Sequence, residues 1–176
     1  IVGNIAGYAH ETGGINTWIG QQAAALANGT RGTVVIGQAT AYNMTSDADY
    51  TTCIGTEAMN AITTGQYNVA VGYQALTTMT ELDKNTAVGW QALKAMSGSA
   101  GTGENTAVGY LAGTALTTGI ASTIIGANAG KSITKGNYNT AVGYLSLQNE
   151  DVGDRSTAVG YSALYSQNSD SDNEIA

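Results

Sequence analysis

A short motif centred on glycine recurs through the whole chain with a regular period. Its clearest copies are NTAVGWQAL from Asn85, NTAVGYLAG from Asn105, NTAVGYLSL from Asn139 and STAVGYSAL from Ser156. The central glycine defines ten copies, at Gly3, Gly20, Gly37, Gly55, Gly72, Gly89, Gly109, Gly126, Gly143 and Gly160. Seven of the nine intervals are seventeen residues long, one is longer by one residue and one by three. Because the chain begins and ends within a repeat, residues 1–176 are interpreted as one repetitive segment cut from a longer array.

A repeat of this length predicts an all-β solenoid of about ten coils. Seventeen residues are too few for the two-helix units of ankyrin or tetratricopeptide arrays. The residue before each central glycine is Val or Ile in all ten copies, and such β-branched residues favour strands. The glycine then permits a turn that a side chain would obstruct. With neighbouring coils about 4.8 Å apart, the segment would form a rod on the order of 50 Å long.

Equivalent positions of successive coils should line up as ladders of like residues. One polar ladder is expected from Asn16, Asn68, Asn85, Asn105 and Asn139, and a threonine ladder runs beside it. The expected core is thin, with one Val or Ile, about two Ala and often one Leu from each coil. Such small residues would allow several chains to share one core. A second glycine seven residues before the anchor, as in Gly65 and Gly119, is expected to mark another bend.

Composition excludes several classes of function. The net charge is −7 and there is no cluster of Lys or Arg, so binding to nucleic acid phosphates is not expected. No uncharged apolar stretch approaches the roughly 18 residues that a membrane span needs, so insertion into a membrane is not expected either. One His and one Cys offer little for catalysis. Cys53 falls in the inner column of small residues and is expected to be a buried filler.

No cofactor or metal is predicted. The segment Ile124–Ser132, IIGANAGKS, imitates a phosphate-binding loop, but Gly126 leaves only three residues before the next glycine, where four are needed. The acidic residues fall in connecting segments without the glycine-rich spacing of calcium-binding β-rolls. They are interpreted as solvated charges, and no carboxylate pair indicates an enzyme.

The unit [N/S]-T-A-[V/I]-G-x-x-[A/S] resembles the head-domain repeat of trimeric autotransporter adhesins. The variant with tyrosine after the glycine, NTAVGYQAL, is also similar to repeats in bacteriophage tail-fibre proteins, and the resemblance covers essentially the whole chain. It implies a left-handed parallel β-roll, a homotrimer, and a place on a virion tail fibre or on a bacterial cell surface. The period is somewhat longer here than in most adhesin heads, which predicts wider coils.

Two sets of residues are candidates for receptor contact. Aromatic residues that follow the central glycine should form a ladder along one edge, broken at Ala127, and could stack on sugars or on one another: Tyr73, Trp90, Tyr110, Tyr144 and Tyr161. The longest interval of the repeat carries extra residues, and insertions in solenoids become loops that often bind. The candidates there are Lys94, Ser97, Ser99, Thr102 and Glu104.

The sequence therefore favours a fibrous attachment segment that binds a host cell-surface glycan or protein receptor through many weak sites. A structural filament or spacer without receptor specificity is the first alternative. An ice-binding solenoid, suggested by the threonine ladder, is the second, although Val34 and Val69 interrupt that ladder.

Overall fold

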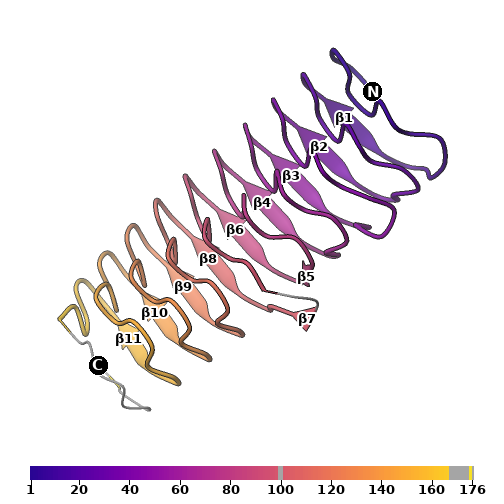
Figure 1. Cartoon of the computed structure of the whole chain (residues 1–176). Coiled ribbons are helices and arrows are strands. Elements are labelled where there is room, and N and C mark those ends of the chain that lie inside the picture. Colours follow the sequence, from indigo (N-terminus) through magenta and orange to yellow (C-terminus); the bar gives the residue numbers. More distant parts are fainter. Residues whose placement is uncertain (99–100, 167–174, 176) are drawn as a thin grey trace.

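The chain folds as a stack of coils built on one parallel sheet. The computed structural model describes residues 1–98, 101–166 and 175, and no helix occurs in these ranges. Nine three-residue strands lie side by side, with β1 and β11 at opposite ends of the stack (Figure 1). They are β1 (Thr17–Ile19), β2 (Val34–Ile36), β3 (Thr52–Ile54), β4 (Val69–Val71), β6 (Thr86–Val88), β8 (Thr106–Val108), β9 (Thr123–Ile125), β10 (Thr140–Val142) and β11 (Thr157–Val159). The predicted parallel β-solenoid is therefore confirmed.

Each strand pairs with the same positions of the next repeat. Thr86 of β6 is opposite Thr106 of β8, for example, although these two repeats are separated by the longest interval. The extra residues leave the main sheet and form β7 (Gly101–Thr102), which pairs in parallel with β5 (Leu82–Asp83). The first copy adds only an isolated bridge from Val2 to Ile19, so nine strands stack in the sheet. Nine stacked strands enclose about eight turns rather than the ten predicted.

The strands alternate between the inside and the outside of the solenoid. The middle residue of every three-residue strand is buried, and the residues on either side of it are not. The Val or Ile before the central glycine therefore faces outward, so its predicted place in the core is wrong. A strand has a side-chain period of two, and in this register the small middle residue is the one that points inward.

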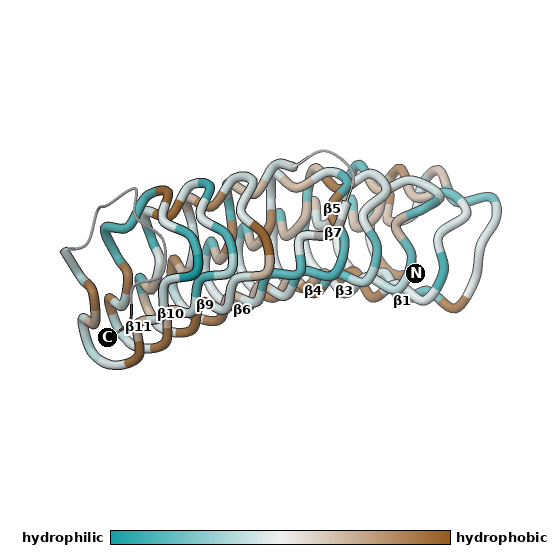
Figure 2. The backbone as a smooth tube through the Cα atoms, turned by 90° about the horizontal axis from the view of Figure 1, so that it is seen from below, coloured by the Kyte–Doolittle hydropathy of each residue, from teal (hydrophilic) through white to brown (hydrophobic). Residues whose placement is uncertain are grey.

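The core is filled by the middle strand residues and by three columns from the turns that follow. Large side chains such as Leu76, Met79, Leu93 and Met96 are fully buried within a single chain. Figure 2 shows hydrophobic segments recurring from coil to coil along the solenoid. Because one chain closes its own core, a core shared between chains is not needed for burial. The homotrimer and the left-handed coil remain predictions from the family resemblance.

Where the middle strand residue is large, a neighbouring turn carries glycine in place of leucine. Coils with Ala70 and Ala87 in the strand are filled by Leu76 and Leu93 four residues after the central glycine. A side chain on Gly113 at that position would meet Ile124 Cδ1 at 2.9 Å. Core volume is thus conserved between columns, in keeping with the close packing of protein interiors.

The central glycines bring successive coils closer than a side chain permits. Their φ angles lie between +127° and +139°. A Cβ on Gly55 would lie 2.6 Å from the carbonyl oxygen of Gly72 in the next coil. The second glycine, seven residues before the central one, is needed for the same reason. A Cβ on Gly65 would lie 2.5 Å from the carbonyl oxygen of Leu82. At Gly65 and Gly119 no left-handed φ is involved, so close approach rather than a special bend explains them.

The predicted asparagine ladder is present, and four of its five members, Asn68, Asn85, Asn105 and Asn139, are buried. Asn68 Oδ1 accepts from the Asn85 backbone amide at 2.8 Å and from Asn85 Nδ2 at 3.2 Å. Asn68 Nδ2 donates to the Leu82 carbonyl at 2.8 Å. Amide-to-amide contact is therefore only part of the arrangement, and each side chain mainly satisfies backbone groups of the next coil. Buried polar groups left without partners would destabilise the stack, so this column fixes the register.

Candidate functional site

The outer face of the main sheet is uncharged over all nine strands. Two columns of side chains point outward from this sheet, and we call them together the outer face. They are the Thr or Val at the first position of each strand and the Val or Ile at the third. Threonine occupies the first position in seven strands, at Thr17, Thr52, Thr86, Thr106, Thr123, Thr140 and Thr157. The third position is well exposed in places, reaching 59% at Val159. Parallel strands about 4.8 Å apart make this a regular hydroxyl and methyl surface.

An aromatic ladder borders the outer face at the carboxyl ends of the strands. We call it the carboxyl-edge ladder, and it comprises Tyr73, Trp90, Tyr110, Tyr144 and Tyr161. The ring of Trp90 stacks on Tyr73 and Tyr110, with centroids 6.0 Å and 5.1 Å away. Tyr144 stacks on Tyr161 at 5.6 Å. All five rings are exposed. The expected ladder, including its break at Ala127, is therefore present, and its receptor contact stays a prediction.

Three further aromatic residues lie at the opposite edge, and the sequence analysis did not predict that they form a column. Tyr50, Tyr67 and Tyr138 precede the strands and are all more than half exposed. Tyr50 and Tyr67 stack with centroids 5.4 Å apart and planes inclined by only 7°. These two tyrosines lie one repeat apart in the sequence, which was a usable signal. The backbone at this position is left-handed, with φ of +53° at Tyr50 and +56° at Tyr67.

The residues of the longest interval do not form one cluster. Lys94 is half-buried, Ser97 is exposed, and Glu104 is exposed. Glu104 lies 3.6 Å from Lys84 Nζ of the preceding coil, at the amino edge of the sheet. No hydrogen bond or ion pair joins Lys94, Ser97 and Glu104 in the described ranges. Thr102 lies in β7, and Ser99 lies outside the described residues.

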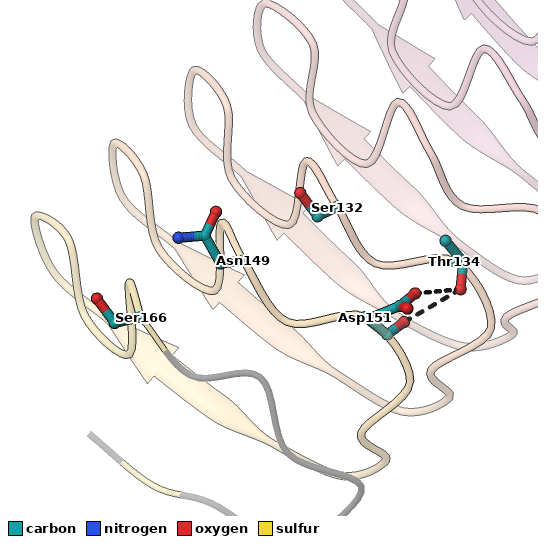
Figure 3. Close-up of a pocket in the computed structure, with 5 residues that line it drawn as sticks. All are labelled: Ser132, Thr134, Asn149, Asp151 and Ser166. Carbon is teal, nitrogen blue, oxygen red and sulfur yellow. Dashed lines mark hydrogen bonds between the residues drawn. The ribbon is translucent and has the colours of Figure 1, made fainter.

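A polar groove lies on another side of the last coils. It is lined by Ser132, Thr134, Asn149, Asp151 and Ser166 and has a volume of about 590 Å³. Figure 3 shows these side chains on successive turns, with Thr134 Oγ1 donating to Asp151 Oδ1. The Asp151 carboxylate already accepts that hydrogen bond. It thus serves the contact between coils.

Other acidic side chains also hold neighbouring coils together. Asp83 Oδ1 accepts from the Gln66 backbone amide at 2.7 Å, and Asp154 Oδ1 accepts from the Asn137 backbone amide at 2.6 Å. The expectation that these are merely solvated charges is therefore wrong. Among the described residues, no group of three or more His, Cys, Asp or Glu side chains is placed to hold a metal ion.

Cys53 is fully buried, as predicted, with its Sγ 3.3 Å from Met59 Sδ. Burial raises the pKa of the Cys53 thiol well above its ordinary value. A neutral, enclosed thiol is a poor nucleophile.

In the ranges that the structure covers, no helix is long and apolar enough to cross a bilayer.

These features define the class as a parallel β-solenoid repeat protein with an uncharged sheet face bordered by aromatic residues. No family model, curated protein or solved structure matches the chain.

Proposed function

We propose that the chain is a repetitive segment of a fibrous attachment protein, from a bacteriophage tail fibre or a bacterial surface adhesin. It acts as a homotrimeric rod that contacts host cell-surface glycan with its carboxyl-edge ladder. The observation that carries the proposal is the line of exposed, stacked rings from Tyr73 to Tyr110 beside an uncharged sheet face. Aromatic rings present an apolar face and a polar tip, which suits the mixed surface of a sugar.

The repeat also supplies many weak contacts at fixed spacing. Equivalent positions recur once per coil, so a glycan-covered surface can engage several rings at once. Linked weak sites bind together far more tightly than any one of them, provided that the geometry allows simultaneous contact. A rigid stack held by backbone hydrogen bonds between coils meets that requirement.

Binding to an array of immobilised cell-surface glycans tests this function. One variant replaces all five ladder residues, Tyr73, Trp90, Tyr110, Tyr144 and Tyr161, with serine. A matched control replaces Tyr8 and Tyr165, which are exposed but lie outside the ladder. We expect the ladder variant to lose glycan binding and the control to keep it, with both retaining the wild-type circular dichroism spectrum. Binding that survives in the ladder variant would refute the ladder as the contact, and a wild type that binds no glycan would leave a spacer or filament as the better interpretation.

The outward threonine column supports a second candidate, an ice-binding surface. Threonine stands at the first position of seven of the nine main strands, on an uncharged sheet face. A thermal-hysteresis assay tests it, with Thr106→Lys and Thr123→Lys as the disrupting changes. Hysteresis that these changes abolish would favour ice binding over attachment.

A further inference from the structure

The carboxyl-edge ladder is interrupted at one coil, although the backbone beneath it is continuous. β9 pairs in register with β8 on one side and with β10 on the other, one repeat apart in each case. The turn after β9 is held like its neighbours, with the Asn128 amide donating to the Tyr110 carbonyl at 2.8 Å and the Leu145 amide donating to the Ala127 carbonyl at 3.1 Å. Only the ring is missing, because Ala127 occupies its place.

Elsewhere the faces of the rings are occupied by one another. Trp90 has a ring on each side and is 40% exposed, whereas Tyr110 and Tyr144, which flank the gap, are 50% and 47% exposed. A sugar cannot lie flat on a ring whose two faces are already covered. Inside the ladder, free faces that look toward each other therefore occur only across Ala127, between Tyr110 and Tyr144.

The width of this gap suits one inserted ring. Tyr110 and Tyr144 are two coils apart, which corresponds to about 9.6 Å. Tyr110 is inclined by 15° to Trp90, and Tyr144 by 23° to Tyr161, so both rings keep the general orientation of the ladder. Stacked rings have centroids roughly 4.5–7 Å apart. A single ring midway in the gap would lie at such a distance from both walls.

We infer that Tyr110, Ala127 and Tyr144 form a slot that sandwiches one β-configured pyranose ring of the gluco type. This inference rests on the proposed glycan contact and narrows it to a sugar class. In a gluco-configured pyranose the ring hydroxyls are equatorial, so axial C–H groups cover both faces. Aromatic faces carry negative charge density and attract such C–H groups. A galacto- or manno-configured ring turns one axial hydroxyl against a wall and loses half of the sandwich.

Polar groups for the equatorial hydroxyls are also at hand. The Tyr110 and Tyr144 rings end in phenolic hydroxyls that can donate and accept. Asn128 follows Ala127 directly and is half-buried between Leu111 and Leu145 of the neighbouring coils. At the equivalent position of other coils, polar side chains bond to one another, as where Gln91 Nε2 donates to Gln74 Oε1 at 2.8 Å. Asn128 has leucine on both sides at this position, so neither of these neighbours offers its side chain such a bond.

Ligand-observed nuclear magnetic resonance with three simple glycosides tests the slot. The probes are methyl β-D-glucopyranoside, methyl β-D-galactopyranoside and methyl β-D-mannopyranoside, titrated into the intact chain. We expect the glucoside to bind about tenfold more tightly than the other two, the loss of one stacking contact. Saturation transferred from the protein should reach glucoside protons on both faces of the sugar ring. Equal binding of the three probes, or no binding of the glucoside, would overturn the inference.

Two substitutions to tyrosine distinguish binding in the slot from binding along the rest of the ladder. Ala127→Tyr completes the ladder and closes the slot, whereas Thr56→Tyr extends the same column beyond Tyr73 without facing a second ring. We expect Ala127→Tyr to weaken glucoside binding at least tenfold and Thr56→Tyr to change it less than twofold. If Ala127→Tyr still binds the glucoside, or binds the glycan array as well as the wild type does, the slot is refuted while the proposed function stands. If the wild type binds no glycan on the array, the proposed function itself fails.

Discussion

At the scale of single residues, the stack depends on positions where a side chain cannot fit. The central glycines combine a left-handed φ with a close approach of the next coil's backbone. Gly89→Ala would place a Cβ against the Gly109 carbonyl, and this oxygen belongs to backbone that is fixed on both sides. We expect a loss of at least about 2 kcal/mol in the free energy of unfolding, measured by urea denaturation.

Gly14→Ala is the matched control, because a Cβ there meets nothing within 4 Å and its φ is not left-handed. Its effect should stay within about 0.5 kcal/mol. Equal stability of the two variants would contradict the role given to close approach between coils.

The buried thiol of Cys53 makes stability depend on pH in the alkaline range. Because burial raises its pKa, the folded chain keeps the thiol proton where the unfolded chain, with a pKa of about 8.5, loses it. The stabilising difference is complete below the unfolded pKa and is lost as the pH rises above it. We expect the wild type to lose more stability than Cys53→Ala between about pH 8 and pH 10, measured by urea unfolding at each pH.

At the scale of the element, the side-chain volume of a strand residue in the core is matched by the volume at the turn packed against it. Ile124→Ala should cost about 2–4 kcal/mol because it leaves a cavity in a close-packed core. The turn position at Gly113 has a φ of +58°, close to the +50° of Leu93 in the same column, so leucine is compatible with that backbone. Gly113→Leu combined with Ile124→Ala should therefore recover part of the loss, whereas Gly113→Leu alone should destabilise the chain. Additive effects in a double-mutant cycle would contradict the exchange of volume.

The sequence was sufficient for the elements and insufficient for their orientation. The seventeen-residue period follows directly from the spacing of Gly55, Gly72 and Gly89, and aligning the copies on these glycines gives the Val or Ile column and the asparagine column. The inward residue was not predictable from hydrophobicity, because Ala87 is buried while the larger Val88 faces outward. Left-handed backbone at Leu93 and Tyr67 was also hidden, because these residues do not favour it and the hydrogen bonds between coils impose it.

At the scale of the whole molecule, the number of chains in the fibre is a separate prediction. One chain has a mass of 17.9 kDa. Light scattering should give three times the mass of one chain for the homotrimer implied by the adhesin and tail-fibre resemblance. A stable monomer would refute the trimer without affecting the solenoid, because a single chain already encloses Leu76, Met79 and Leu93.

The aromatic ladder was predictable as a column, but its consequences were not. The sequence places Tyr110, Ala127 and Tyr144 at equivalent positions of successive repeats. Only the stacking distances show that most ring faces are already occupied and that a gap of one coil is the open place. β7 separates the candidate residues of the long interval. The pairing of β7 with β5 could not be predicted from the repeat pattern.

The central claim, that the carboxyl-edge ladder beside the outer face contacts the receptor, is tested most directly by placing charges on the adjoining strands. Thr106→Lys and Thr123→Lys put two cations on neighbouring strands of the outer face, beside the ladder. Thr118→Lys, at an exposed turn position outside the sheet, is the matched control. Glycan-array binding should fall at least tenfold in the double variant and remain unchanged in the control, because buried or misplaced charges are costly at an interface. Undiminished binding of the double variant, or an equal loss in Thr118→Lys, would contradict the account.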